Sequence, residues 1–175
     1  MKIGIFGVTA NPFHLGHWEA LRLASESVDE LWVSPVFTHP FGKKFVDYSY
    51  RKSMLELTLK DFPLEKVRIK ELDKQYYEKF NETVYSYKLL TYLKTLYPEH
   101  EFKLVIGADN YKPEVWTRFY KYEEIENQFG LVILPDKGAH STQIRELLQN
   151  SENIDNLVSK SVKNFIYKHN LYKEE

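Results

Sequence analysis

The sequence contains no cysteine and no long apolar run. Without cysteine, the 175-residue chain can form no disulfide bond, no cysteine-ligated metal site and no cysteine nucleophile. No apolar stretch approaches the roughly 20 residues that a membrane-spanning helix needs. The apolar run at residues 2–6 is too short for a signal peptide. These absences predict a cytoplasmic protein that does not bind membranes.

The sequence also has almost no excess of charge. Lysine and arginine number 24, aspartate and glutamate number 25, and the net charge is -1. This balance argues against a protein that binds nucleic acid, although a few well-placed cations suffice for a small anionic ligand. Hydrophobic residues make up 43%, enough for a packed core. The length suits one domain, so residues 1–175 are predicted to form a single domain.

Short apolar and amphipathic segments alternate along the chain. Buried strands are predicted at residues 2–6, 31–36, 67–72, 102–106 and 131–134. Helices are predicted at residues 18–25, 50–60, 83–97, 142–149 and 157–169, with Ser49 as the cap of the second. The polar, tyrosine-rich residues 73–81 are predicted to form a loop. The alternation predicts an α/β fold: a single doubly wound, Rossmann-like parallel sheet with helices on both faces.

The loop after the first predicted strand carries the first candidate site. In open α/β sheets, ligands bind at the carboxyl ends of the strands. Residues 7–17 read Gly-Val-Thr-Ala-Asn-Pro-Phe-His-Leu-Gly-His, which places His14 and His17 on one side of a first helical turn. Free N–H groups at that turn favour an anion, and imidazoles can donate hydrogen bonds to phosphate. Two alternatives are an ordinary surface pair and a zinc site, although no third or fourth zinc ligand is evident nearby.

A second candidate site lies late in the chain, after the last predicted strand. Ser141 or Thr142 is predicted to cap a helix there, and Arg145 follows in its first turns. Two hydroxyls, free backbone N–H groups and a guanidinium could together hold a triphosphate. The alternative is a capped helix with a surface arginine.

Both segments resemble signatures of the adenylyl- and cytidylyltransferase superfamily. Members often read Gly-Gly-Thr-Phe-Asp-Pro-Pro-His-x-Gly-His in the first and Ile-Ser-Ser-Thr-x-Ile-Arg in the second. The matching positions here are Gly7, Thr9, Pro12, His14, Gly16, His17, Ser141, Thr142, Ile144 and Arg145. The departures are Val8, Ala10, Asn11, Phe13, Ala139 and His140. Val8 replaces a glycine, which makes close approach of the backbone to phosphate less certain there.

Further segments resemble the nicotinate or nicotinamide mononucleotide branch of that superfamily. Gly107 and Asp109 match a Gly-x-Asp segment that binds nucleotide in the branch, and Trp116 matches a tryptophan that stacks on the pyridine ring. The alternative for Trp116 is core packing. Thr83 and Ser86 roughly match a Thr-x-x-Thr helix start near the pyridine substituent. A last group resembles the branch's proline, basic loop and Arg-x-x-Met helix: Pro35, Lys43, Lys44, Arg51 and Met54. Outside the resemblance, the two lysines could simply belong to a solvated loop.

The resemblance implies an enzyme that transfers the adenylyl group of ATP to a pyridine mononucleotide and releases pyrophosphate. It implies that His14, His17 and Arg145 are catalytic. The implied ATP-binding residues are Gly7, Val8, Thr9, His14, Gly16, His17, Lys43, Lys44, Ser141, Thr142 and Arg145. The implied mononucleotide-binding residues are Asn11, Thr83, Gly107, Asp109 and Trp116. Few carboxylates are placed to form a metal cage, so Mg²⁺ is expected to arrive with ATP rather than at a site of the protein's own.

Other functions remain open at this point. The acceptor could be phosphopantetheine or a cytidylyl acceptor, although the segments at Gly107 and Trp116 argue against both. The chain could also be a nucleotide-binding regulator without activity, which the intact His14, His17 and Arg145 disfavour. A structural or interaction module would not need two phosphate-type loops. The sequence decides neither between nicotinate and nicotinamide nor whether the chain forms a homo-oligomer.

Overall fold

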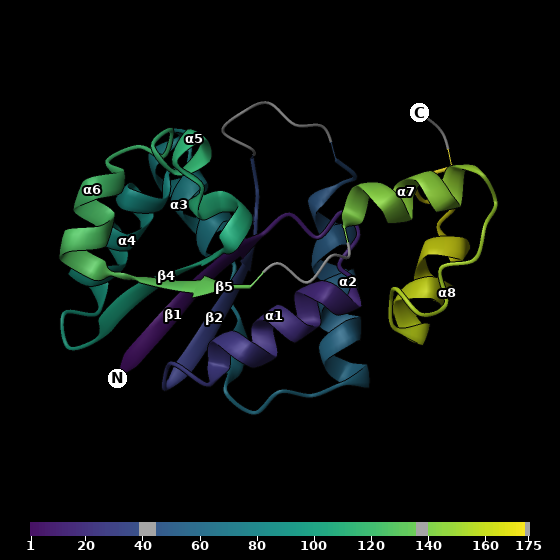
Figure 1. Ribbon diagram of the computed structural model, residues 1–175, viewed down its shortest axis with the longest axis horizontal. Helices are drawn as coiled ribbons and strands as arrows, with labels where there is room; N and C mark the ends of the chain where they lie inside the picture. The colour runs from purple at the N-terminus through teal and green to yellow at the C-terminus, as the bar shows by residue number, and fades with distance from the viewer. Residues whose placement is uncertain (39–44, 136–139, 174–175) are drawn as a thin grey trace.

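A parallel β-sheet forms the centre of the computed structural model, which describes residues 1–38, 45–135 and 140–173. The five strands lie in the order β3-β2-β1-β4-β5, and every neighbouring pair is parallel. They are β1 (Lys2–Val8), β2 (Glu30–Pro35), β3 (Val67–Ile69), β4 (Glu101–Gly107) and β5 (Leu131–Leu134) (Figure 1). The sheet confirms the five predicted strands and the Rossmann-like fold.

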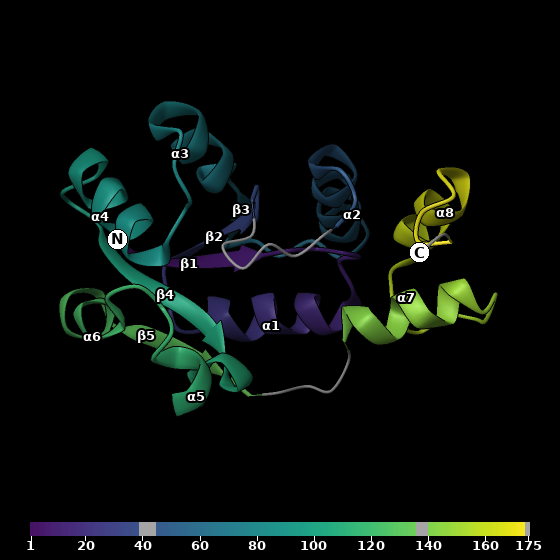
Figure 2. The same cartoon turned by 90° about the horizontal axis from the view of Figure 1, so that it is seen from above.

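Helices cover both faces of this sheet. They are α1 (Leu15–Ser25), α2 (Tyr48–Asp61), α3 (Leu72–Phe80), α4 (Ser86–Leu96), α5 (Pro113–Trp116), α6 (Tyr122–Glu124), α7 (Ser141–Gln149) and α8 (Lys160–Lys168). Two shorter helical segments are η1 (Ala108–Tyr111) and η2 (Ile125–Phe129). Figure 2 shows α3 and α4 on one face of the sheet and α1 on the other. No helix of the described segments is long and apolar enough to cross a membrane.

The core is divided into two apolar clusters, one on each face. Ile3 and Ile5 of β1 pack in the cluster beneath α3 and α4, whereas Val8 packs with α1, α2, α7 and α8. Successive side chains of a strand point to opposite faces, so a sheet covered on both sides needs apolar residues at nearly every position. This explains why the central strands read as continuous apolar runs in the sequence.

Several local predictions were wrong. Residues 73–81 do not form a loop, because nearly all of them belong to α3, whose buried Leu72 and Tyr76 lie one turn apart and pack against the sheet face. The N-cap of α2 is Asp47 rather than Ser49. Helix α1 begins at Leu15, three residues before the predicted start. Helix α1 begins earlier because His14 and His17 form a local reciprocal capping box there, whereas α3 is stabilised by the packing of its apolar residues against the sheet.

The order of the strands creates a crevice between β1 and β4. The chain runs outward from β1 to β2 and β3, and then returns to place β4 on the other side of β1. Connections therefore leave the carboxyl ends of β1 and β4 in opposite directions, which is the point where α/β sheets bind ligands. The loop after β1 and the segment η1 after β4 lie at this position.

Candidate active site

Two cavities meet at the carboxyl ends of β1 and β4. The first has a volume of about 380 Å³ and the second about 470 Å³. Their shared wall consists of Phe6, Gly7, Thr9, Gly107 and Asn110. Two ligands could therefore lie in neighbouring cavities, each with one end at the shared wall.

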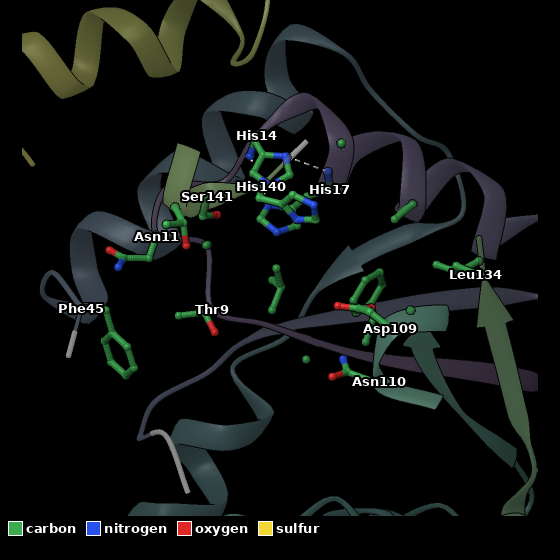
Figure 3. A pocket seen from close by; sticks show the side chains of 18 of the residues that line it. Thr9, Asn11, His14, His17, Phe45, Asp109, Asn110, Leu134, His140 and Ser141 are labelled. Atoms are coloured by element: carbon green, nitrogen blue, oxygen red, sulfur yellow. Dashed lines mark hydrogen bonds between the residues drawn. The ribbon is translucent and has the colours of Figure 1, made fainter. Parts of the chain in front are cut away.

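His14 and His17 form a reciprocal pair at the start of α1. Nδ1 of His14 accepts a hydrogen bond from the backbone N–H of His17 at 3.3 Å, and Nδ1 of His17 accepts one from the backbone N–H of His14 at 3.2 Å. The rings stack with their centroids 3.6 Å apart. A neutral imidazole that accepts at Nδ1 carries its proton on Nε2. Both residues line the first cavity, so both rings can offer Nε2–H donors to a ligand (Figure 3).

Burial keeps this histidine pair neutral. It lowers the pKa of His14 to about 4, with a smaller contribution from the neighbouring His140. It also holds the pKa of His17 well below its usual value, and His14 adds to that shift. Near pH 7 the pair therefore supplies hydrogen-bond donors without positive charge. His140, which the sequence prediction did not include in the site, lines the same cavity and lies beside the pair (Figure 3).

The start of α7 closes the other side of the first cavity. Its N-cap is His140, whose side chain makes no capping hydrogen bond, so the prediction of Ser141 or Thr142 as the cap was wrong. The hydroxyl of Ser141 instead donates to the backbone oxygen of Pro12 at 3.0 Å, which joins α7 to the loop after β1. Without a side-chain cap, the first N–H groups of α7 add to a surface that favours an anion.

Arg145 connects the two segments that resembled superfamily signatures. Its Nη1 donates to the backbone oxygen of Asn11 at 2.7 Å, and its Nη2 donates to Oγ1 of Thr142 at 3.1 Å. It lines the first cavity, and none of the ion pairs within the described residues includes it. The guanidinium is thus oriented by neutral oxygens and keeps its positive charge for a ligand.

Two glycines of the shared wall differ in what lies beside them: open space at Gly7 and the carboxylate of Asp109 at Gly107. A Cβ added at Gly7 would meet no atom within 4 Å, so the protein leaves the space beside this residue open. A Cβ added at Gly107 would lie 2.7 Å from Oδ1 of Asp109, so glycine allows that carboxylate to fold over the end of β4. Val8, in contrast, packs into the core and is 5% exposed. Its departure from the superfamily pattern therefore adds a buried side chain that contributes to packing.

Arg51 fixes the loops that border both cavities. Its guanidinium is 1% exposed and donates to three backbone oxygens: those of Val46 at 2.9 Å, Thr9 at 3.0 Å and Val36 at 2.5 Å. The ring of Phe45 lies 4.0 Å from it. Because Thr9 and Val36 line the cavities, this one side chain sets the position of two cavity walls.

The second cavity has largely apolar walls and presents a phenylalanine rather than a tryptophan. Trp116 is 4% exposed, lies in the core beneath α3 and α4, and lines neither cavity. Its indole N–H donates to Glu126 at 2.5 Å. Phe119 lines the second cavity, with its ring centroid 4.8 Å from that of Trp116. Phe119 and Phe6 of the shared wall are the aromatic side chains that line this cavity, and Phe119 is the one beside Trp116; the sequence prediction missed both.

Most of the residues predicted from the sequence line the first cavity. The first cavity is lined by Gly7, Val8, Thr9, Asn11, His14, Gly16, His17, Gly107, Asp109, Ser141, Thr142 and Arg145. Thr83 lines neither cavity, although its neighbour Val84 and Ser86 line the second. Lys43 and Lys44 lie outside the described residues.

No three histidine, aspartate or glutamate side chains of the described segments come close enough together to hold a metal ion.

Comparison with known proteins agrees with this architecture. Residues 5–158 match the cytidylyltransferase-like family, and the chain belongs to that family. It is 32% identical to a protein of Oceanobacillus iheyensis named probable nicotinate-nucleotide adenylyltransferase, over 98% of this chain and 96% of that protein. It is 28% identical to the nicotinate-nucleotide adenylyltransferase of Bacillus subtilis, over 98% of each chain. The solved structure of Plasmodium falciparum nicotinic acid mononucleotide adenylyltransferase complexed with NaAD shares the fold, with a TM-score of 0.81, 19% identity and coverage of 99% and 98%.

Proposed function

We propose that this chain transfers the adenylyl group of ATP to nicotinate or nicotinamide mononucleotide, forming the dinucleotide and pyrophosphate. The observation that carries the proposal is the pair of adjoining cavities, the first of which is lined by His14, His17 and Arg145. The names of the relatives from Oceanobacillus and Bacillus support the same reaction. An enzyme that consumes ATP and a mononucleotide would work in the cytoplasm, where we place this protein.

ATP would occupy the first cavity. The Nε2–H groups of His14 and His17 would donate to its phosphate oxygens, and the start of α7 would offer backbone N–H groups. Arg145 would offset the charge that builds up on the leaving pyrophosphate. Lys43 and Lys44, which lie between β2 and α2 in the sequence, would add positive charge.

The mononucleotide would occupy the second cavity, with its phosphate at the shared wall. Phe119 would pack against the pyridine ring, and Trp116 would support Phe119 from behind. Asn11, Gly107 and Asp109 lie at or next to the shared wall, where they could contact the mononucleotide. Thr83 lines neither cavity, so it would act indirectly, by positioning the adjoining Val84 and Ser86, which line the second.

The reaction needs positioning more than acid–base chemistry. An oxygen of the mononucleotide phosphate would form a bond to the α-phosphorus of ATP while the bond from that phosphorus to the pyrophosphate oxygen breaks. The attacking phosphate is already an anion, so no general base is required. Mg²⁺ bound with ATP would neutralise phosphate charge. Of the described residues that line the first cavity, Asp109 alone carries a carboxylate that could help to hold the ion.

Steady-state kinetics with ATP, Mg²⁺ and each mononucleotide test the proposal. The expected result is equimolar dinucleotide and pyrophosphate with at least one of the two substrates. Binding of ATP without release of pyrophosphate would instead identify a nucleotide-binding regulator. Turnover with phosphopantetheine or with CTP, but with neither pyridine mononucleotide, would move the chain to another branch of its family.

A further inference from the structure

A buried carboxyl group lies in the wall of the second cavity. Asp73, the second residue of α3, is 7% exposed and lines this cavity. Its Oδ1 accepts a hydrogen bond from the hydroxyl of Ser34 at 3.1 Å, and its backbone N–H donates to the same hydroxyl oxygen at 3.2 Å. Ser34 pairs with Gly7 in the register of β1 and β2, so Asp73 lies beside the shared wall.

The charge of Asp73 is only weakly compensated. None of the ion pairs within the described residues includes it. Burial raises its pKa to about 7, although the Ser34 hydrogen bond and the positive charge of Arg51 oppose the increase. Tyr48 of α2 is a further titratable neighbour, and burial, with a smaller contribution from Glu71, raises the pKa of its hydroxyl well above the usual value, so it stays neutral near pH 7. Arg118, which carries the opposite charge, also lines this cavity.

We propose that Asp73 determines how the second cavity distinguishes nicotinate from nicotinamide mononucleotide. When ionised, it disfavours the carboxylate of nicotinate and favours the carboxamide of nicotinamide. When protonated, it can donate a hydrogen bond to the carboxylate, and the discrimination weakens. This inference rests on the proposed function, because it assumes that the second cavity holds the pyridine ring.

Nicotinate and nicotinamide mononucleotide differ in the charge of the ring substituent, so comparing their rates isolates the effect of that charge. They share the ribose and the phosphate, so the ionisation of that phosphate cancels when their rates are compared. The nicotinate carboxylate stays ionised from pH 6 to pH 8, because ordinary carboxyl groups titrate near 4. The carboxamide is neutral throughout. Any change in relative preference over this pH range must therefore come from the protein.

Direct contact with Asp73 is not required for the effect. Two negative charges about 10 Å apart, at an effective dielectric constant of about 20, alter an affinity by roughly tenfold. Asp73 lines this cavity, so the charge of a ring substituent bound there would act on it at short range. Arg118 shifts the absolute preference toward nicotinate, but its charge is constant between pH 6 and pH 8. The pH dependence of the preference therefore reports on Asp73.

The test is the ratio of kcat/KM for nicotinate to that for nicotinamide mononucleotide, measured from pH 6 to pH 8. With a pKa near 7 and a tenfold effect of full ionisation, the ratio should fall about fivefold over this range. Asp73→Asn should abolish the fall and raise the ratio at pH 8. Ser34→Ala should move the midpoint to higher pH, because it removes a hydrogen bond that favours the ionised form. The control is Asp155→Asn, which removes an exposed carboxylate paired with Lys163 and should leave the ratio unchanged.

Three results would overturn the inference. One is a ratio that does not depend on pH, and another is the same dependence in Asp73→Asn. The third is an equal effect of Asp73→Asn on both substrates, which would place Asp73 at the ribose or phosphate that they share. If the wild-type protein converts neither substrate, the proposed function fails. Calorimetric affinities of both mononucleotides at pH 6 and pH 8 would still decide the role of Asp73.

Discussion

His14 and His17 each accept, through Nδ1, a hydrogen bond from the other residue's backbone N–H. The two nitrogens of each ring therefore have different roles. On one side it satisfies a backbone donor at the start of α1, where helix N–H groups lack partners. On the other side it can present Nε2–H to the first cavity. The tautomer needed at the ligand is thus fixed by the structure of the helix end.

Replacing His17 by alanine should mainly damage turnover. The loss of one phosphate donor in the transition state typically lowers kcat by a factor on the order of 10². The loss of the reciprocal cap should cost about 1 kcal/mol, or a few degrees of Tm. Rates and thermal melts should be compared with His169→Ala, which removes an exposed imidazole that lines neither cavity. A folded His17→Ala protein with near-normal kcat would contradict the assignment.

Lysine should not replace Arg145 fully. The guanidinium bonds Asn11 and Thr142 through separate nitrogens, and an ammonium group cannot reproduce that fork. We expect kcat/KM of Arg145→Lys to fall by roughly tenfold or more, since each decade corresponds to about 1.4 kcal/mol. The same exchange at Arg22, a surface residue of α1 paired with Glu19, should leave the rate unchanged. Equal rates for the two variants would mean that Arg145 acts as a surface charge only.

Phe119 and Trp116 should give opposite signatures when each is replaced by alanine. Removing an aromatic stacking face costs about 1–3 kcal/mol, so Phe119→Ala should raise KM for the mononucleotide roughly 5- to 150-fold. KM for ATP and Tm should change little. Trp116→Ala empties a buried site at a cost of about 3–5 kcal/mol, so it should lower Tm and affect both substrates alike.

Trp116→Phe keeps a smaller ring in the core and should fall between wild type and Trp116→Ala in Tm. Both KM values and Tm should be measured on all three variants. A selective rise in the mononucleotide KM of Trp116→Ala, with Tm preserved, would restore the original prediction that Trp116 stacks on the pyridine ring.

Gly7→Ala should separate binding from folding. The added methyl group meets no protein atom, so Tm should stay within about one degree of the wild type. It would project from the wall that both cavities share, so kcat/KM should fall with either substrate varied. Gly4→Ala is the matched control, because its Cβ would lie 2.9 Å from Cδ1 of Leu31 and should lower Tm. Normal kinetics in Gly7→Ala would show that no ligand approaches this part of the wall.

The sequence predicted the strands and the first cavity, because both depend on local patterns. Continuous apolar runs mark strands that are buried on both faces, and most of the matching residues of both superfamily signatures line one cavity. Asp73 could not be recognised in this way. It was assigned to a loop, and its burial depends on α3 packing over Ser34, 39 positions earlier in the chain.

The confusion between Trp116 and Phe119 has a similar cause. Both aromatic residues follow β4 within one short segment, and either could face a ligand. What buries Trp116 is the arrangement of α5 and η2, including the hydrogen bond of its indole to Glu126 ten residues later. Spacing alone does not predict which of two neighbouring rings turns inward.

The hydrogen bonds of Arg51 also affect which residues of the cavity loops can be substituted. It holds the cavity walls through the backbone oxygens of Thr9, Val36 and Val46, and every amino acid carries such an oxygen. The side chains of those loops can therefore change while the path of the chain is preserved. Departures from the signature at Val8 and Ala10 are therefore compatible with the same loop path, because Arg51 binds the backbone oxygen of Thr9 between them. The loops could accordingly be redesigned for a new acceptor, provided that residue 51 stays untouched.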